Sequence, residues 1–500
     1  MKFLYVVLLF LAFSVKLFPH QKLDSLVTLG NEQSFQFEFS KANQIFEQVI
    51  DKYPNSCLGY YFISRNNLWF YVANKDSVSK NKYLNYVEIA LSKAETEFDE
   101  NSESAVNNYN LGNVYLLKSI YASTEQNTMD AFWSTKKAVN YFEEAIELDS
   151  NFYAPYLGVG TIKYALGFVP GFLGLAISVA GLDGEKSEGL NLILKAYQNT
   201  TSHLIKVEAA YHLGKIYTEF NAEYDNAEKY LSTLVNNYPK NELFLYQYAI
   251  LQIDKHNLKT SEKYLDKILF DSTKHKFFQT YALSLFLKGE ISFKQNDFAK
   301  AISDYQNFIK ESNSIDYTGI AYLKIAISYL MLDDVLNANK YFLLARNGNQ
   351  NIAEDSFATE MSKELFNKKF SKIDKLIVES QNNLESGQYK FVIKQLVPKK
   401  ASKEEVFKMD LILAEVYQQI HDFQRSGQIL KTYSNLDDFS EYYDFARLLY
   451  LKTNQAYFEK RYAFAKEILQ EAYKNLNEHD NKLNRLLINL DSKLTFQKEQ

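Results

Sequence analysis

The side chains that most often perform catalysis or bind metals are sparse along this 500-residue chain. Its seven histidines are His20, His203, His212, His256, His275, His421 and His479. No two of them lie three or four residues apart, so no helix presents the imidazole pair that is typical of a zinc site. Cys57 is the only cysteine, which excludes an intramolecular disulfide and favours a buried apolar role. A Cys–His nucleophile assembled in space is the weaker alternative.

Glycine pairs and acidic pairs also give little support for catalysis. Gly158–Gly160 and Gly171–Gly174 lack the preceding strand and the following lysine that allow a glycine-rich loop to hold phosphate. Glu143–Glu144, Asp333–Asp334 and Glu404–Glu405 are adjacent residues, so their side chains diverge on a helix. We therefore predict no catalytic residues, no cofactor, no metal site and no enzymatic activity.

The composition favours helices. Six prolines and seventeen glycines are too few for the many tight turns of a sheet protein. The 38 tyrosines and 37 phenylalanines suit either a core of bulky residues or a binding groove lined by aromatic rings. The formal net charge of −5 is spread over mixed charges without long runs of one sign, so nucleic acid is not an expected partner.

Residues 319–352 have the spacing of two packed helices. The segment reads GIAYLKIAISYLMLDDVLNANKYFLLARNGNQNI. With Gly319 at position 1 of a 34-residue unit, positions 4, 7, 8, 11, 20 and 24 are Tyr322, Ile325, Ala326, Tyr329, Ala338 and Phe342. Small residues at positions 8 and 20 let the two helices approach each other, and aromatic residues fill the space around them. In these residues the chain resembles the tetratricopeptide-repeat (TPR) family.

The resemblance implies an all-α fold in which TPR-type helix-turn-helix repeats stack into a right-handed superhelix, an α-solenoid. Before the repeats we predict a signal peptide at 1–14, with cleavage as late as residue 20 as an alternative. Irregular TPR-like repeats follow at 21–200, with an apolar Gly-rich insert at 166–189. Regular TPR repeats are predicted at 201–350, and degenerate TPR-like repeats with a C-terminal capping helix at 351–500. Small residues that keep the register in this last region include Ser380, Ala414 and Thr453.

The N-terminal segment predicts export. Met1-Lys2 precedes FLYVVLLFLAF, an apolar run of the length of a signal-peptide core and shorter than the roughly 20 residues that span a bilayer. Ala12 and Ser14 supply small residues for cleavage. An uncleaved N-terminal anchor is the alternative, because 15–18 partly extends the apolar run. We expect an exported protein of the periplasm or envelope of a Gram-negative bacterium.

The insert is the most irregular part of the chain. Apart from Ser178, residues 168–182 are apolar residues, glycine and proline, and the segment is too short and too rich in glycine for a spanning helix. Three interpretations remain: a hairpin buried against neighbouring repeats, an apolar patch for a partner protein, or a loop that dips into a membrane. Similar insertions occur in some exported bacterial TPR proteins. The candidate partner or membrane contacts are Phe168, Phe172, Leu173, Leu175, Ile177, Val179 and Leu182.

The resemblance also implies a binding face. In the TPR family the first helices of successive pairs line a concave groove with positions near 2, 5, 9, 12 and 13. The candidate peptide-groove residues at these positions are Tyr109, Asn113, Thr161, Tyr164, Tyr211, Lys215, Tyr246, Phe286 and Glu290. For each of them, helix–helix packing is the alternative role. The family's two-carboxylate clamp is not carried over, because only Asn113 and Lys215 fit its chemistry.

These patterns together predict an exported, non-enzymatic scaffold that binds protein or peptide partners through an aromatic groove. One alternative is a membrane-associated assembly or transport accessory factor that uses 168–182 as its contact. Another is an accessory protein that binds a small ligand such as a sugar or lipid. The sequence gives no prediction of oligomeric state.

Overall fold

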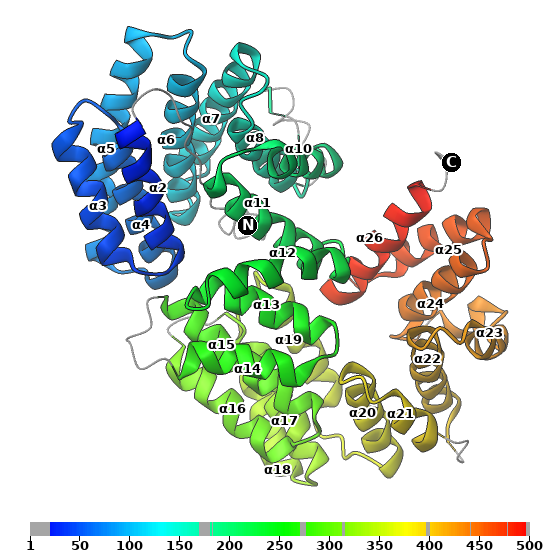
Figure 1. Ribbon diagram of the computed structural model, residues 1–500. Coiled ribbons are helices and arrows are strands. Elements are labelled where there is room, and N and C mark those ends of the chain that lie inside the picture. Colours follow the sequence, from blue (N-terminus) through cyan, green and yellow to red (C-terminus); the bar gives the residue numbers. More distant parts are fainter. Residues whose placement is uncertain are drawn as a thin grey trace. The chain divides into compact units, whose positions relative to one another are not determined.

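The computed structural model describes residues 21–169, 181–182, 184–270, 277–312, 316–396, 401–440, 442–477 and 479–496. Within these ranges the chain forms 24 α-helices and one short 3-10 helix, and no strand (Figure 1). The predicted all-α fold of TPR-type repeats is therefore confirmed. The signal-peptide prediction at 1–14 and five insert contacts, Phe172, Leu173, Leu175, Ile177 and Val179, lie outside the described residues.

The chain divides into two compact units. Unit 1 holds the described residues of Met1–Lys215, Asn226–Tyr248 and Asp271–Thr280, and unit 2 holds those of Ile216–Asp225, Ala249–Phe270 and Tyr281–Gln500. The predicted boundaries near residues 200 and 350 stay predictions.

Unit 1 is built from consecutive helix pairs. Its helices are α2 (Gln21–Phe35), α3 (Phe39–Lys52), α4 (Leu58–Asn74), α5 (Ser77–Glu100), α6 (Ala105–Thr124), α7 (Thr128–Leu148), α8 (Ala154–Leu166) and α10 (Lys186–Asn199). Four helices contain residues of both units: α11 (His203–Glu219), α12 (Tyr224–Asn237), α13 (Glu242–Asp254) and α15 (Phe278–Lys294), of which 278–280 lie in unit 1. Polar side chains start several of these helices, as where Ser104 accepts the backbone N–H of Asn107 before α6.

Unit 2 continues the same pattern. Its helices are α14 (Leu258–Leu269), α15 (Phe278–Lys294), α16 (Phe298–Glu311), α17 (Thr318–Met331), α18 (Val335–Ala345), α19 (Ala353–Leu365), α20 (Lys372–Glu385), α21 (Tyr389–Gln395), α22 (Lys403–Gln419), α23 (Phe423–Lys431), η1 (Leu436–Phe439), α24 (Phe445–Phe458), α25 (Tyr462–Asn475) and α26 (Asn481–Phe496). The 319–352 repeat forms α17 and α18. Its small residues Ala326 and Ala338 and its aromatic residue Phe342 are all fully buried, as the spacing predicts.

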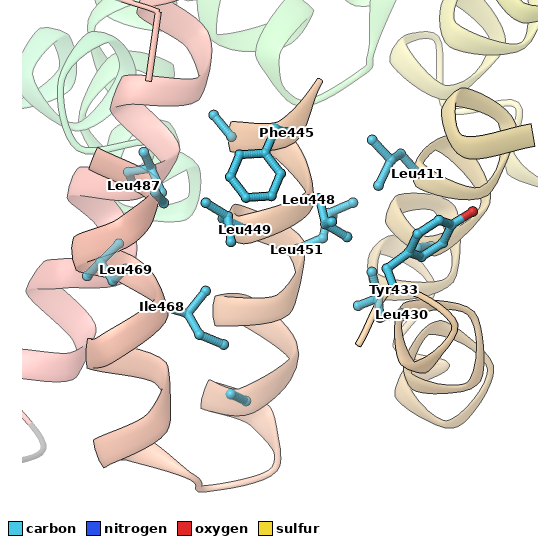
Figure 2. Packing of buried hydrophobic residues seen from close by; sticks show 14 of the residues in the cluster. Leu411, Leu430, Tyr433, Phe445, Leu448, Leu449, Leu451, Ile468, Leu469 and Leu487 are labelled. Carbon is cyan, nitrogen blue, oxygen red and sulfur yellow. The ribbon is translucent and has the colours of Figure 1, made fainter. Parts of the chain in front are cut away.

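The C-terminal helices of unit 2 share one apolar core. Figure 2 shows α24 between α25 and α26 on one side and α22 and α23 on the other. Leu449 of α24 points toward Leu469 and Leu487, whereas Leu448 and Leu451 point toward α22. Because α24 is packed on both sides, the polar residues at its N-terminal end are held in fixed positions.

Asp355 gives unit 2 a pH-dependent stability. It is fully buried in α19, and its carboxylate accepts the backbone N–H groups of Ile320 at 2.9 Å and Asn349 at 2.8 Å. Burial raises the pKa of the Asp355 carboxyl group from 3.8 to about 6. The folded state therefore binds this proton more tightly than the unfolded state, and the free energy of unfolding should fall as pH rises from about 4 to about 6.

We expect Asp355→Asn to flatten this part of the stability curve, because an amide keeps one acceptor oxygen and does not titrate. Urea denaturation followed by far-UV circular dichroism at several values between about pH 4 and pH 7 measures the difference between the two proteins. An unchanged pH dependence in Asp355→Asn would show that this carboxyl group does not titrate in that range.

Candidate functional site

The groove residues predicted in unit 1 lie mainly inside the helix packing. Tyr109, Asn113, Thr161, Tyr164 and Lys215 are buried, and Tyr211 and Tyr246 are half-buried. The Tyr109 ring lies 5.8 Å from the ring of Phe142 and 4.9 Å from that of Phe152. Burial raises the pKa of the Tyr109 hydroxyl group well above its usual value. This tyrosine therefore contributes area to the core of unit 1.

Two of the predicted insert contacts are described. The ring of Phe168 lies 5.5 Å from that of Tyr164, and Nζ of Lys186 lies 3.7 Å from the centre of the Phe168 ring. Leu182 is buried. The Phe168 ring thus packs against other residues of unit 1.

A buried charged cluster occupies the interior of unit 1. Nη2 of Arg65 in α4 donates a hydrogen bond of 2.6 Å to Oδ1 of Asn31, and Nη1 lies 3.9 Å from Oε1 of Glu208 in α11. The guanidinium group also lies over the rings of Phe62 and Trp69, at 4.5 and 4.7 Å from their centres. Burial lowers the pKa of Arg65 to about 10. Since the side chains of Arg65 and Glu208 are both fully buried, this cluster serves the fold.

Unit 2 has a partly open polar pocket of about 180 Å³ between α20, α22, α24 and α26. It is lined by Gln381, Glu385, Glu415, Tyr443, Asp444, Ala446, Arg447, Tyr450, Asn477, Asp480, Lys482, Leu483 and Leu486. Four of these side chains are acids, two are bases and two are tyrosines. The pocket is the candidate functional site.

The repeat register explains why these side chains line one pocket. Position 8 in three C-terminal repeats is held by Ser380, Ala414 and Thr453, which are all fully buried. Counted from them, positions near 2, 5, 9 and 13 are Gln381 and Glu385 in α20, Glu415 in α22, and Arg447 and Tyr450 in α24. These are the positions that line the groove in the TPR family. The candidate groove residues predicted from the sequence end at Glu290 in α15. They do not include the residues of these more degenerate repeats, although the same groove positions could have been counted there.

Glu385 is held as a carboxylate by two lysines. Lys294 of α15 contacts it directly, and Lys482 Nζ lies 3.1 Å from its Oε1. Burial opposes ionisation, but the two lysines hold the pKa of Glu385 well below its usual range. Lys294 also lies 3.8 Å from Glu290, whose Oε1 accepts a 2.5 Å hydrogen bond from the hydroxyl group of Tyr305. The predicted groove residue Glu290 is thereby connected to the pocket; Phe286, the other prediction in this unit, instead packs on the Tyr305 ring at 5.7 Å.

Glu415 and Arg447 form the second matched pair of the pocket. Nε and Nη2 of Arg447 donate to Oε2 of Glu415 at 3.0 and 2.5 Å, and Nη2 also donates to Oε1 of Gln381 at 2.9 Å. Burial opposes the charge of Arg447, but Glu415 and Asp444 raise its pKa above the usual value. Burial and the charge of Glu415 raise the pKa of Tyr450, so its hydroxyl group is protonated at neutral pH. The side chains are held in place before any ligand binds.

The described ranges contain neither a cluster of three or more His, Cys, Asp or Glu side chains suited to a metal ion nor a helix with a long enough apolar stretch to cross a membrane. These two findings apply only to the residues that the structure describes.

Comparisons with known proteins agree with the repeat fold. A model of the Iml2/Tetratricopeptide repeat protein 39 family matches residues 80–417, and a Tetratricopeptide repeat model matches residues 29–56. No curated protein matches the chain.

Among solved structures, the chain is similar to the TPR domain of P58(IPK), with 18% identity, 83% of this chain and 95% of that chain covered, and a TM-score of 0.21. It is also similar to a chain of the APC/C hetero-tetramer Cut9-Hcn1, with 14% identity, coverage of 97% and 98%, and a TM-score of 0.25. A chain of Naa15/Naa10 bound to HypK-THB matches at 11% identity, coverage of 96% and 97%, and a TM-score of 0.21. With scores this low, none of these structures assigns a role to a residue here. The family match to residues 80–417 spans more than half of the sequence, and the chain therefore belongs to the Iml2/Tetratricopeptide repeat protein 39 family.

Proposed function

We propose that this protein is a scaffold that binds a peptide segment of a partner protein on the first-helix face of unit 2. We define this face by the pocket-lining residues of α20, α22, α24 and α26. The observation that carries the proposal is that the pocket is lined at groove positions of three successive repeats and closed by α26. A partner segment lying along the face would contact all four helices, as in other helical-groove interactions.

The size of the pocket favours a peptide over a small free ligand. Pockets for small molecules and cofactors have volumes of roughly 300–1,000 Å³. A pocket of about 180 Å³ instead suits one side chain of a longer segment, which binds the rest of its length outside. The matched pairs around Glu385 and Glu415 are already formed, so little order has to be gained on binding.

Selection from a random peptide library displayed on phage tests the proposal with the purified chain. The wild-type protein should enrich a family of related sequences. Leu486→Trp, which adds an indole at the pocket wall, should weaken the binding of an enriched synthetic peptide by about tenfold or more. Leu486 is half-buried, and no hydrogen bond of its side chain would be lost.

Leu336→Trp provides the matched control, because Leu336 lies in the second helix α18 and is 87% exposed. Fluorescence anisotropy of the labelled peptide measures both variants. Equal binding by the wild type and Leu486→Trp, or the absence of any enriched family, would overturn the proposal.

A further inference from the structure

One acid of the pocket departs from its usual structural role. Asp444 precedes α24 at the N-cap position, yet its side chain makes no capping hydrogen bond. Elsewhere in the described chain, the N-cap aspartates Asp76, Asp297, Asp334 and Asp422 each accept the backbone N–H three residues later. A missing cap leaves backbone N–H groups of the first helical turn without this partner and destabilises the helix. The carboxylate of Asp444 lines the pocket instead.

The pocket also has more negative charge than its own cations match. Glu385 is matched by Lys294 and Lys482, and Glu415 by Arg447. Asp444 and Asp480 have no basic partner within 4 Å among the described residues.

The other interactions of Asp444 and Asp480 do not neutralise their negative charges. Asp480 Oδ1 accepts the backbone N–H of Leu483 at 2.9 Å and so caps α26 without losing its charge. Lys408 and Arg447 both feel the charge of Asp444. Lys408 Nζ, however, lies 2.6 Å from Glu404, and Arg447 Nη2 lies 2.5 Å from Glu415, so each cation is bound to another carboxylate. The interior of the pocket therefore has a net negative charge, which attracts cations.

An aromatic ring lies beside these two acids. Tyr443 lines the pocket and is 50% exposed, so its ring is accessible to a ligand. Burial of its hydroxyl group, followed by the charges of Asp480 and Asp444, raises the pKa of Tyr443. The phenol of Tyr443 is therefore neutral at physiological pH, and both carboxylates lie close enough to influence it. A carboxylate pair beside an aromatic ring suits an ammonium or guanidinium group, which gains both ion pairing and contact with the ring.

Building on the proposed function, we infer that the pocket takes a basic side chain, a lysine or an arginine, of the partner peptide. Asp444 and Asp480 supply its counter-charges, and Tyr443 packs against its stem or head group. An acidic side chain would add to the negative charge, and an apolar one would take two carboxylates out of water without compensation. The chemistry recognised is thus a single positive charge on a flexible aliphatic stem.

The test uses the sequences enriched from the phage library. They should share a lysine or arginine at one position, and replacing that residue by norleucine should weaken binding by about tenfold or more. The double variant Asp444→Asn/Asp480→Asn should cause a similar loss, because it removes both charges while the amide oxygen introduced at position 480 can still cap α26. Combining the norleucine peptide with the double variant should add little further loss, since both changes remove the same interaction.

Asp438→Asn is the matched control, because it removes one exposed carboxylate of η1 outside the pocket and should leave binding within about twofold. Far-UV circular dichroism checks that all variants are folded. Enriched peptides that lack a shared basic residue, yet lose binding in Leu486→Trp, would overturn the inference while the peptide-binding function stands. A library that yields no enriched family overturns both.

Discussion

Arg65→Leu is expected to lower the free energy of unfolding of unit 1 by about 3–5 kcal/mol, because it removes one member of a buried charged pair. The substitution takes away the cation 3.9 Å from the Glu208 carboxylate and the donor to Asn31. It also removes the contacts of the guanidinium group with Phe62 and Trp69. Both tryptophans of the chain, Trp69 and Trp133, belong to unit 1, so urea denaturation followed by tryptophan fluorescence reports this unit.

The second half of this experiment separates charge pairing from packing. Glu208→Leu alone should also be strongly destabilising, but Arg65→Leu/Glu208→Leu should cost less than the sum of the two by about 1 kcal/mol or more. Lys206→Leu, at an exposed position of the same helix α11, should change the stability by less than about 0.5 kcal/mol. Strict additivity of the two single substitutions would show that Arg65 and Glu208 do not stabilise each other.

Gly189→Ala is expected to destabilise unit 1 by about 2–3 kcal/mol through overpacking. A Cβ atom at Gly189 in α10 would lie 2.5 Å from the backbone nitrogen of Tyr164 and 2.7 Å from the carbonyl oxygen of Gly160, both in α8. Backbone atoms cannot turn aside as a side chain can, so the two helices must move apart. This cost should exceed the roughly 1 kcal/mol that alanine normally gains over glycine inside a helix.

Asn191→Ala serves as the control for Gly189→Ala. Asn191 is exposed and lies two residues further along α10, so alanine there should leave the stability unchanged or raise it slightly. The midpoint of urea denaturation, again followed by tryptophan fluorescence, compares the two variants. A Gly189→Ala protein as stable as the wild type would mean that α8 and α10 do not depend on this close approach.

The helix pairs were predictable because their signals are local. In 319–352, Ala326 and Ala338 come from the two helices of one repeat, and the turn between them is a few residues long. The hydrogen bond from Asn337 N–H to Asp334 starts the second helix within the same segment. The close approach of α8 and α10 at Gly160 and Gly189 has no such local signal, because Gly189 lies within the insert predicted at 166–189 and a longer segment separates the two helices. Small residues at the fixed spacing of one repeat therefore allow its helix pair to be predicted from the sequence.

The roles of the groove positions were not predictable in the same way. Tyr109 and Glu290 fill comparable register positions, near 5 and 9, on first helices. Tyr109 is buried against Phe142 and Phe152. Glu290 is half-buried, lies 3.8 Å from Lys294 and accepts a hydrogen bond from the hydroxyl group of Tyr305. The register states which face a residue occupies, but not what packs over that face. The peptide groove predicted from Tyr109 and the other candidate groove residues therefore stays a prediction.

By itself, the sequence determined that this protein is a stack of TPR-type helix pairs and which positions face the inner side of each repeat. Only the tertiary structure decided that Glu415, Arg447 and Asp480, from three different repeats or caps, surround one pocket. Charge balance at that pocket depends on contacts such as Lys294 with Glu385, which join helices far apart in the chain. The physical reason is that helix pairing rests on local spacing, whereas a binding site depends on how repeats are stacked and which charges that stacking leaves unmatched.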